Sequence, residues 1–193
     1  MRSMSDTSKS MPVPARIKQA LDRPVALVGM MGSGKTIIGR KLARELELAF
    51  VDSDARIVET AGISIAEIFE IAGEDRFRAL ERDAIHDAVE EGPMILSTGG
   101  GAICAPDTAQ LLRERTIVVW LSAAPETLLE RIGSVGSRPL LHGDDPLGTL
   151  RRLARERETD YGKAHITVKT DRLSAWSTTS AVLSALDTHL AVT

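Results

Sequence analysis

Short apolar runs alternate with longer amphipathic stretches from Pro24 to the C-terminal end of the chain. The runs, rich in β-branched residues and predicted to be strands, are residues 25–28, 49–51, 94–97, 116–121 and 165–169. Each gap between successive runs is long enough for the helical crossover that parallel strands require. The alternation therefore predicts a parallel sheet flanked by helices, in a single α/β domain spanning residues 24–193.

The amphipathic stretches follow the helical period. In residues 35–46, Ile38, Leu42 and Leu46 recur at i, i+4 and i+8, which is the apolar stripe of a helix that packs on a core. Similar patterns predict further helices at residues 64–89 (interrupted near Gly73), 107–115, 125–132, 147–161 and 177–190.

Two segments do not fit the alternation. Residues 1–23 are rich in Ser, Lys, Arg and Pro and lack the apolar segment of a signal peptide, so we expect a flexible tail or an extra helix there. Residues 133–146 contain three Gly and two Pro and show little periodicity. Loops of that length in compact domains usually carry function, so this segment is predicted to be a lid.

Composition narrows the class of protein. The 193 residues are 43% hydrophobic and 26% charged, which fits a folded domain and excludes a disordered chain. A net charge of −3 and only two Trp, one Tyr and three Phe argue against a nucleic-acid or anionic membrane surface. The single Cys104 has no partner for an internal disulfide, and no apolar run approaches a membrane span of about 18 residues. We expect a soluble, cytoplasmic monomer.

One motif predicts nucleotide binding. The segment from Gly29 to Thr36, GMMGSGKT, fits the phosphate-loop pattern G-x-x-x-x-G-K-[ST], follows the first apolar run and opens the first helix. Its glycines allow successive backbone N–H groups to face one anion at a helix N-terminus. Lys35 is predicted to reach the β- and γ-phosphates of a nucleotide, and Thr36 to bind Mg²⁺. The alternative is a glycine-rich turn without a ligand. The predicted nucleotide-binding residues of the loop are Gly32, Ser33, Gly34, Lys35 and Thr36.

A phosphate loop does not define the reaction. The candidates are a phosphotransferase acting on a small molecule, a GTPase-type switch, and a regulator that binds ATP without consuming it. The chain contains no Asn, so the guanine signature Asn-Lys-x-Asp is absent. The one Asp-x-x-Gly match, at residues 145–148, lies beside the predicted lid and not after a strand. These observations favour the phosphotransferase.

Two carboxylates follow the second predicted strand. Ligands of open α/β sheets gather beyond the carboxyl ends of the strands. Residues i and i+2 of an extended segment share a side, so Asp52 and Asp54 are predicted to face one site. We assign Asp52 to Mg²⁺ and Asp54 to the hydroxyl of the phosphate acceptor. The alternative is a turn in which these residues cap a following helix.

Three successive glycines follow the third predicted strand. Gly99, Gly100 and Gly101 carry a large entropic cost, which suits a place where a ligand touches the backbone; a plain tight turn is the alternative. Three arginines, Arg131, Arg138 and Arg157, are candidate clamps for phosphate or carboxylate groups. Arg78 has the helical spacing of an exposed ion-pair ladder with Glu74 and Arg82.

Taken in order, GMMGSGKT, DSD, FRALE, STGGG, SRPLL and Arg157 before Tyr161 resemble the shikimate kinase family from about residue 25 to about residue 190. The resemblance implies a nucleoside-monophosphate-kinase-like fold whose five-stranded parallel sheet has the order 2-3-1-4-5. It also implies ATP-dependent phosphorylation of the 3-hydroxyl of shikimate, a step toward chorismate and the aromatic amino acids. Another small-metabolite kinase of this fold, for gluconate or a nucleotide, is the alternative.

The resemblance also implies roles for residues. Asp54 would bind the shikimate hydroxyls and take the proton, and Asp52 would lie near the metal. Arg138 would close with the lid over ATP as a catalytic residue, while Arg131 and residues 170–175 would flank the adenine. Glu81 would support the substrate-binding residues. The residues that would bind shikimate are Asp54, Arg78, Gly99, Gly100, Gly101 and Arg157.

Two positions depart from the family pattern. Ile37 follows Thr36 where the family usually has Thr, at a place expected near the α-phosphate. Thr159 stands where the family often has Pro in Arg-x-Pro-x-Tyr, which bears on the position of Arg157.

Overall fold

Five parallel strands form one sheet in the order β2-β3-β1-β4-β5. The computed structural model describes residues 11–133, 141 and 144–192. The sheet and its strand order confirm the predicted fold class, with each strand within about one residue of its predicted bounds. The strands are β1 Val25–Val28, β2 Phe50–Asp52, β3 Ile95–Ser97, β4 Ile117–Ser122 and β5 Ile166–Lys169.

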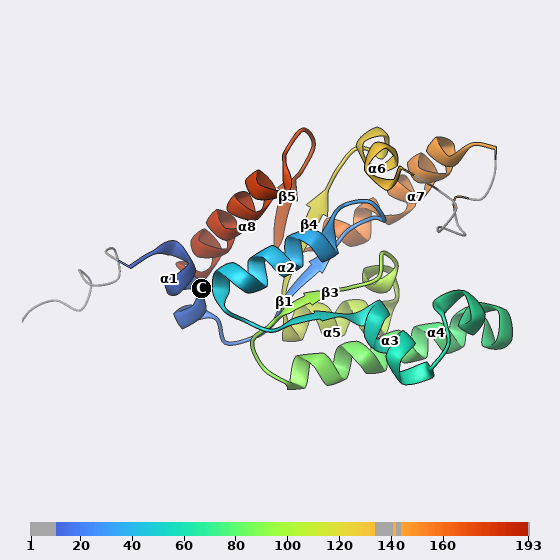
Figure 1. The fold of residues 1–193 in the computed structure, drawn as a ribbon, viewed down its shortest axis with the longest axis horizontal. Coiled ribbons are helices and arrows are strands. Elements are labelled where there is room, and N and C mark those ends of the chain that lie inside the picture. The colour runs from blue at the N-terminus through green and yellow to red at the C-terminus, as the bar shows by residue number, and fades with distance from the viewer. Residues whose placement is uncertain (1–10, 134–140, 142–143, 193) are drawn as a thin grey trace, which may run out of the picture.

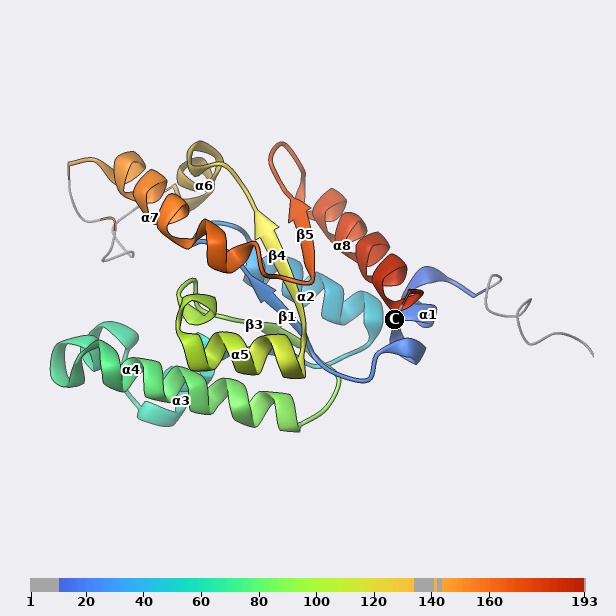
Figure 2. The ribbon, with the colours of Figure 1, turned by 180° about the vertical axis from the view of Figure 1, so that it is seen from behind.

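Helices cover both faces of the sheet, so the domain has three layers (Figures 1 and 2). On one side lie α1 (Val13–Ala20), α2 (Lys35–Leu46) and α8 (Ala175–Leu190). On the other side lie α4 (Ile65–Glu90), α5 (Pro106–Arg115) and α7 (Pro146–Tyr161). The remaining helical elements are α3 (Ser53–Ala61), the 3₁₀ turn η2 (Ala102–Cys104) and α6 (Pro125–Ile132). Among the described residues, no helix is both long and apolar enough to cross a bilayer.

The central strand β1 explains the two-sided core. All four of its residues are buried, and successive side chains point to opposite faces. Val25 and Leu27 pack with α1, α2 and α8, whereas Ala26 and Val28 pack with α4, α5 and α7. A strand buried on both faces has a continuous apolar sequence, as residues 25–28 do.

The strand register brings three loops to one edge. Ser97 at the end of β3 pairs with Leu27 of β1 on one side and with Asp52 of β2 on the other. The three strands therefore end at nearly the same level. The segments that follow them, which begin at Gly29, Ser53 and Thr98, emerge together.

Residues 13–20 form α1, one of the two forms expected for the N-terminal segment. Ile17 is 1% exposed and packs in the core with α8, and Arg16 forms an ion pair with Asp187. Residues 1–10 lie outside the described part of the chain, and the domain boundary at residue 24 stays a prediction.

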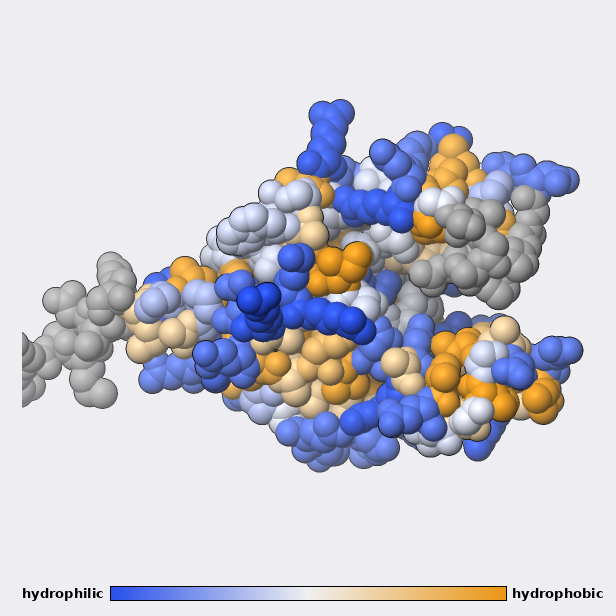
Figure 3. Space-filling view, in the orientation of Figure 1, coloured by the Kyte–Doolittle hydropathy of each residue, from blue (hydrophilic) through white to orange (hydrophobic). Residues whose placement is uncertain are grey.

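A helix pair beyond β2 differs most from the prediction. The sequence patterns did not predict α3, which begins because the Asp52 carboxylate accepts hydrogen bonds from its first backbone N–H groups and ends at Gly62 with φ +71°. The predicted break in α4 is confirmed at Gly73, whose φ of 76° and ψ of 177° are not helical. Exposed apolar side chains, Val58, Phe69 and Ile71, lie on this pair, where Figure 3 shows an apolar area.

Candidate active site

A cleft of about 490 Å³ lies at the edge where β1, β2 and β3 end. The surface is hollowed between the α3–α4 pair and the side formed by α6 and α7 (Figure 3). The residues that line the cleft are 31–38, Asp52, Asp54, 97–100, Arg131, Ile132, Leu173, Ala175 and Thr178. The phosphate loop, the two aspartates and part of the triple glycine thus line the same cleft.

The backbone of the phosphate loop requires glycine. Gly32 has φ +80°, and a Cβ there would lie 2.7 Å from the carbonyl oxygen of Leu128. Gly34, with φ +90°, is the N-cap of α2, and no side chain caps that helix. The first N–H groups of α2 are therefore left for a ligand in the cleft, which is the arrangement that holds phosphate at a helix N-terminus.

Lys35 folds back over the loop. Its Nζ donates hydrogen bonds to the carbonyl oxygens of Gly29 at 2.8 Å and Met30 at 3.1 Å. The ammonium charge is thereby held across the loop, beside the N-terminus of α2. An anion bound by the loop would meet a full positive charge as well as the helix dipole.

Asp52 and Asp54 both line the cleft, but not as the sequence pattern predicted. The expectation that they share one side of an extended segment is wrong, because β2 ends at Asp52 and Asp54 lies in the first turn of α3. Asp52 caps α3 by accepting hydrogen bonds from the backbone N–H groups of Asp54 and Ala55 at 3.2 and 3.4 Å. Asp52 therefore caps α3 and also lies in the predicted site.

Asp52 also meets the phosphate loop. The Thr36 hydroxyl donates to Oδ2 of Asp52 at 3.0 Å. A carboxylate and a hydroxyl side by side next to a phosphate site are hard oxygen donors, the ligand type that Mg²⁺ prefers. Within the described ranges, no group of three or more His, Cys, Asp or Glu side chains could hold a metal. A pair of protein ligands completed by phosphate and water suits Mg²⁺, which keeps much of its hydration.

Each glycine of the triple glycine backs onto a different functional group. A Cβ at Gly99 would lie 2.6 Å from Glu81 Oε1 and 2.9 Å from Asp54 Oδ1, and one at Gly101 would lie 2.6 Å from Arg78 Nη2. At Gly100 the nearest atom would be the carbonyl oxygen of the phosphate-loop residue Gly29, at 3.4 Å. The absence of side chains lets the turn touch all of these groups at once.

Glu81 and Arg78 form a buried ion pair behind the turn. Arg78 Nη1 lies 2.7 Å from Glu81 Oε2, and Glu81 is fully buried while the Arg78 side chain is 28% exposed. Burial raises the pKa of Glu81; Arg78 opposes that shift and the charge of Asp54 adds to it. Burial also disfavours the charge of Arg78, but Glu81 and Glu74 outweigh it and raise the pKa of the guanidinium.

The ion-pair ladder considered for this helix exists in part. Arg78 Nη2 contacts Glu74 at 3.1 Å, while Arg82 pairs with Asp107 at 3.5 Å and Asp83 at 3.8 Å. The ladder therefore ends at Arg78, whose second partner Glu81 directs it toward Gly101.

Arg157 and Tyr161 reach the turn from α7. Arg157 Nη1 donates to the carbonyl oxygen of Gly100 at 3.1 Å, and the Tyr161 hydroxyl donates to the same oxygen at 2.5 Å. Helix α7 continues through Thr159 to Tyr161, so these residues, four apart, lie on one helix face. With Thr at residue 159, Arg157 lies beside the triple glycine.

Arg131 is tied to the loop that follows β5. Its Nη1 donates to the Thr170 hydroxyl at 3.0 Å and its Nη2 to the Thr170 carbonyl oxygen at 2.5 Å. Asp171, which the sequence patterns did not single out, accepts from the backbone N–H of Ala124 at 2.8 Å and from the Thr127 hydroxyl at 2.9 Å. The hydrogen bond from Ala124 is the main cause that lowers the pKa of Asp171. An acidic residue two positions after a predicted strand was the available signal.

The predicted site residues fall into three groups. The loop residues 32–36, the two aspartates, Gly99, Gly100 and Arg131 line the cleft. Arg78, Arg157 and Gly101 do not line the cleft. Arg78 lies next to Gly101 and Arg157 contacts Gly100, so both arginines lie behind the triple-glycine turn. Arg138 and most of the predicted lid, residues 133–146, lie outside the described residues.

Cys104 is partly buried at the end of η2. Burial raises the pKa of its thiol, which favours the neutral form and argues against a reactive nucleophile.

Comparison with known proteins gives a consistent result. The family model of shikimate kinase matches residues 31–187. A shikimate kinase of Nitrobacter winogradskyi is 46% identical over 81% of this chain and 73% of its own length, and one of Novosphingobium aromaticivorans is 44% identical over 91% and 93%. Among solved structures, the shikimate kinase from Acinetobacter baumannii in complex with shikimate has a TM-score of 0.80 and 37% identity, covering 84% of this chain and 91% of that one.

Proposed function

The chain belongs to the shikimate kinase family and catalyses the ATP-dependent phosphorylation of shikimate, and we propose how its residues divide this work. The alternative acceptors, gluconate or a nucleotide, are not favoured, because the matching family and the similar proteins are shikimate kinases. The observation that carries the proposal is the cleft that the phosphate loop, Asp54, Gly99 and Gly100 line together.

The phosphate loop binds the triphosphate of ATP. The uncapped N–H groups at the start of α2 receive the phosphate oxygens, and Lys35 lies against the β- and γ-phosphates. The adenine lies toward Arg131 and residues 170–175. Hydrogen bonds of Arg131 and Asp171 hold this segment against both ends of α6. Arg138 is proposed to act from the lid, outside the described residues.

Shikimate lies against the triple glycine. Arg78 and Arg157 bind its carboxylate, since a guanidinium pairs with a carboxylate through charge-assisted hydrogen bonds. Glu81 holds Arg78 in place through their 2.7 Å contact. The Arg78 side chain is therefore partly ordered before the substrate binds. The closest approach of the turn to Asp54, at Gly99, brings the hydroxyls of shikimate to that carboxylate.

Asp54 acts as the general base. The 3-hydroxyl oxygen of shikimate forms a bond to the γ-phosphorus while the bond from this phosphorus to the β,γ-bridging oxygen breaks. The hydroxyl proton passes to the Asp54 carboxylate and ADP leaves. Such transfers depend mainly on positioning and on charge stabilisation, which Lys35 and the N-terminus of α2 provide.

Thr36 and Asp52 would hold Mg²⁺, because their oxygens already lie 3.0 Å apart beside the loop. When bound, the ion neutralises charge on the β- and γ-phosphates. We also propose that the enzyme is cytoplasmic and monomeric and has no nucleic-acid or membrane partner.

A coupled assay of ADP release tests the function. The chain is incubated with ATP and Mg²⁺ and, in separate reactions, with shikimate, gluconate and each nucleoside monophosphate. We expect turnover with shikimate at least a hundredfold above that with any other acceptor. ADP release that is independent of the acceptor, or faster with gluconate, would contradict the assignment.

A further inference from the structure

The carbonyl oxygen of Gly100 is the meeting point of two different donors. Arg157 Nη1 lies 3.1 Å from it and the Tyr161 hydroxyl 2.5 Å from it. A carbonyl oxygen has two lone pairs, so these two hydrogen bonds use its full capacity.

The two donors differ in how firmly they are held. Tyr161 is 1% exposed and belongs to the core, and its ring stacks on that of Trp120 with centroids 5.5 Å apart and planes 10° apart. Burial also raises the pKa of Tyr161, so its hydroxyl keeps its proton. Arg157 is only half-buried and carries a charge for which a carboxylate is a stronger partner than a carbonyl.

The turn that carries Gly100 has no side chains of its own with which to hold its position. Its neighbours nevertheless depend on that position. Gly99 approaches Asp54 and Glu81, Gly101 approaches Arg78, and Gly100 lies over the carbonyl of Gly29 in the phosphate loop. A small displacement of the turn would therefore change both the shikimate wall and its distance from the phosphates.

We propose that Tyr161 is a positioning residue for shikimate, and this inference rests on the proposed function. Its hydroxyl holds the Gly100 carbonyl while Arg157 leaves that carbonyl for the substrate carboxylate. Tyr161 touches neither substrate. It keeps the triple-glycine turn in place at the moment when the other donor is withdrawn.

Kinetics of Tyr161→Phe test the proposal, because this variant keeps the buried ring and removes only the hydroxyl. We expect the KM for shikimate to rise about five- to twentyfold, with kcat reduced less than threefold and the KM for ATP within a factor of two. Thr116→Val is the matched control. Its buried hydroxyl donates to the carbonyl of Leu112 at 2.6 Å, away from the residues that line the cleft.

The control separates positioning from general stability. Both variants are expected to lower Tm by a similar amount, and only Tyr161→Phe is expected to change the KM for shikimate. An unchanged KM in Tyr161→Phe, or an equal rise in Thr116→Val, would overturn the proposal. Failure of the wild-type chain to phosphorylate shikimate would instead contradict the proposed function.

A second measurement does not depend on turnover. Tyr161 is the single tyrosine of the chain, so biosynthetic incorporation of 3-fluorotyrosine labels one site. We expect the one ¹⁹F resonance to shift on titration with shikimate, because withdrawal of Arg157 leaves Tyr161 as the sole donor to Gly100. A resonance that stays unchanged at saturating shikimate would overturn the proposed role.

Discussion

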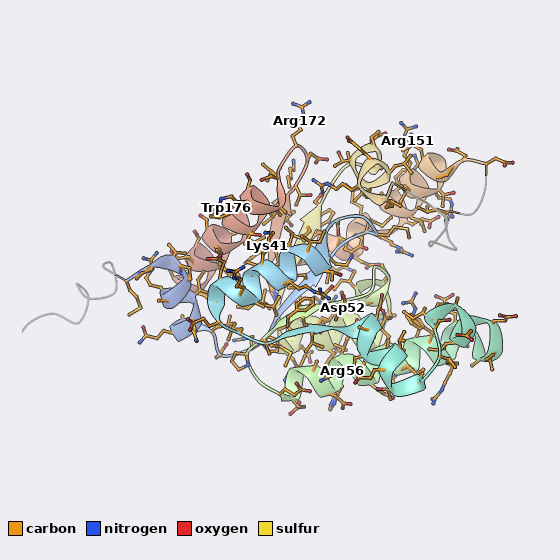
Figure 4. The ribbon with its side chains drawn as sticks, in the orientation of Figure 1. Lys41, Asp52, Arg56, Arg151, Arg172 and Trp176 are labelled. Carbon is orange, nitrogen blue, oxygen red and sulfur yellow. The ribbon has the colours of Figure 1, made fainter. Side chains whose placement is uncertain are left out.

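The Thr36 hydroxyl donates to the Asp52 carboxylate at 3.0 Å, and through this contact the first turn of α2 is joined to the N-cap of α3. One oxygen of Asp52 faces Thr36, while the other accepts from the backbone N–H groups of Asp54 and Ala55. Figure 4 shows Asp52 in the space between these two helices. The carboxylate thus serves the fold with one oxygen and the proposed magnesium site with the other.

Asp52→Asn should separate these roles, because Asn keeps a capping oxygen and loses the charge. We expect the Mg²⁺ concentration for half-maximal activity to rise about tenfold or more, while the free energy of unfolding changes by less than about 0.5 kcal/mol. A Mg²⁺ titration of activity with parallel urea unfolding measures both quantities. Asp52→Ala, which loses the cap as well, should cost about 1 kcal/mol of stability.

Lys35→Met should lower kcat strongly, since the ammonium that faces the phosphates is lost. Removing one such group costs about 2–4 kcal/mol of transition-state stabilisation, or roughly a 30- to 1,000-fold loss of rate. Lys41→Met is the matched control, because Lys41 lies on the exposed side of the same helix (Figure 4). Steady-state kinetics should show the loss in the first variant alone; near wild-type kcat in Lys35→Met would refute the phosphate-loop assignment.

Asp54→Asn should keep the fold and ATP binding while kcat falls by about a hundredfold or more, the usual contribution of a general base. Binding of ATP is measured by calorimetry and kcat by ADP release. If Asp54→Asn is mild and Asp52→Asn abolishes activity at every Mg²⁺ concentration, the two aspartates have the opposite roles.

Arg78→Ala should raise the KM for shikimate about tenfold to 150-fold, because a hydrogen bond to a charged group contributes about 1.5–3 kcal/mol. The KM for ATP should change far less, since the phosphates are bound elsewhere. Arg78→Lys should recover part of the loss, because an ammonium cannot form two parallel bonds. Arg82→Ala, one helical turn along α4 and paired with Asp107, is the control and should leave both KM values unchanged.

Stability should fall as the pH drops below about 6.5, the ordinary pKa of His in the unfolded chain. The Nδ1 atom of His165 accepts a hydrogen bond from the backbone N–H of Val118 at 2.9 Å, which only the neutral ring can do. Burial, with the charges of His189, Arg23 and Arg113, lowers the pKa of His165. Between the folded and the unfolded pKa of His165, the unfolded chain therefore binds more protons than the folded protein. The stability that neutral His165 contributes is complete above the unfolded pKa, and it is lost as the pH falls toward the folded pKa.

The slope cannot exceed about 1.4 kcal/mol per pH unit for a single proton. His165→Asn offers the test, because its Oδ1 can replace Nδ1 as the acceptor and does not titrate. Urea unfolding between pH 5 and 8 should show a smaller pH dependence for this variant than for the wild type. Identical curves for the two proteins would exclude His165 as the cause.

Local patterns were sufficient for most of the fold. The helix at residues 35–46 and the run at residues 25–28 were predicted with their observed bounds, because a central buried strand and an amphipathic helix are recognisable over a few residues. The break at Gly73 is likewise a local feature, since a glycine interrupts the helical pattern there. Local patterns do not predict helix α3, because its N-cap, Asp52, directly follows an apolar run that is typical of a strand.

The sequence by itself determined which chemical groups the site contains. The phosphate loop, the two aspartates, the triple glycine and the arginines are all evident from residue types and spacing. The register of β1, β2 and β3 was not evident, and it alone brings the ends of these strands to one level. That register depends on side chains packed on both faces of the sheet, across separations of more than 40 residues.

Tertiary structure also decided the partners of each group. The Gly100 carbonyl accepts from residues 57 and 61 positions later in the chain, and Asp171 reaches back 47 positions to Ala124. No local pattern encodes such contacts, because a hydrogen bond depends on the distance between two atoms and the packing of α7 and α6 on the sheet sets that distance. The residue types therefore indicate which chemical groups the site contains, and the packing of helices on the sheet sets the distances between them.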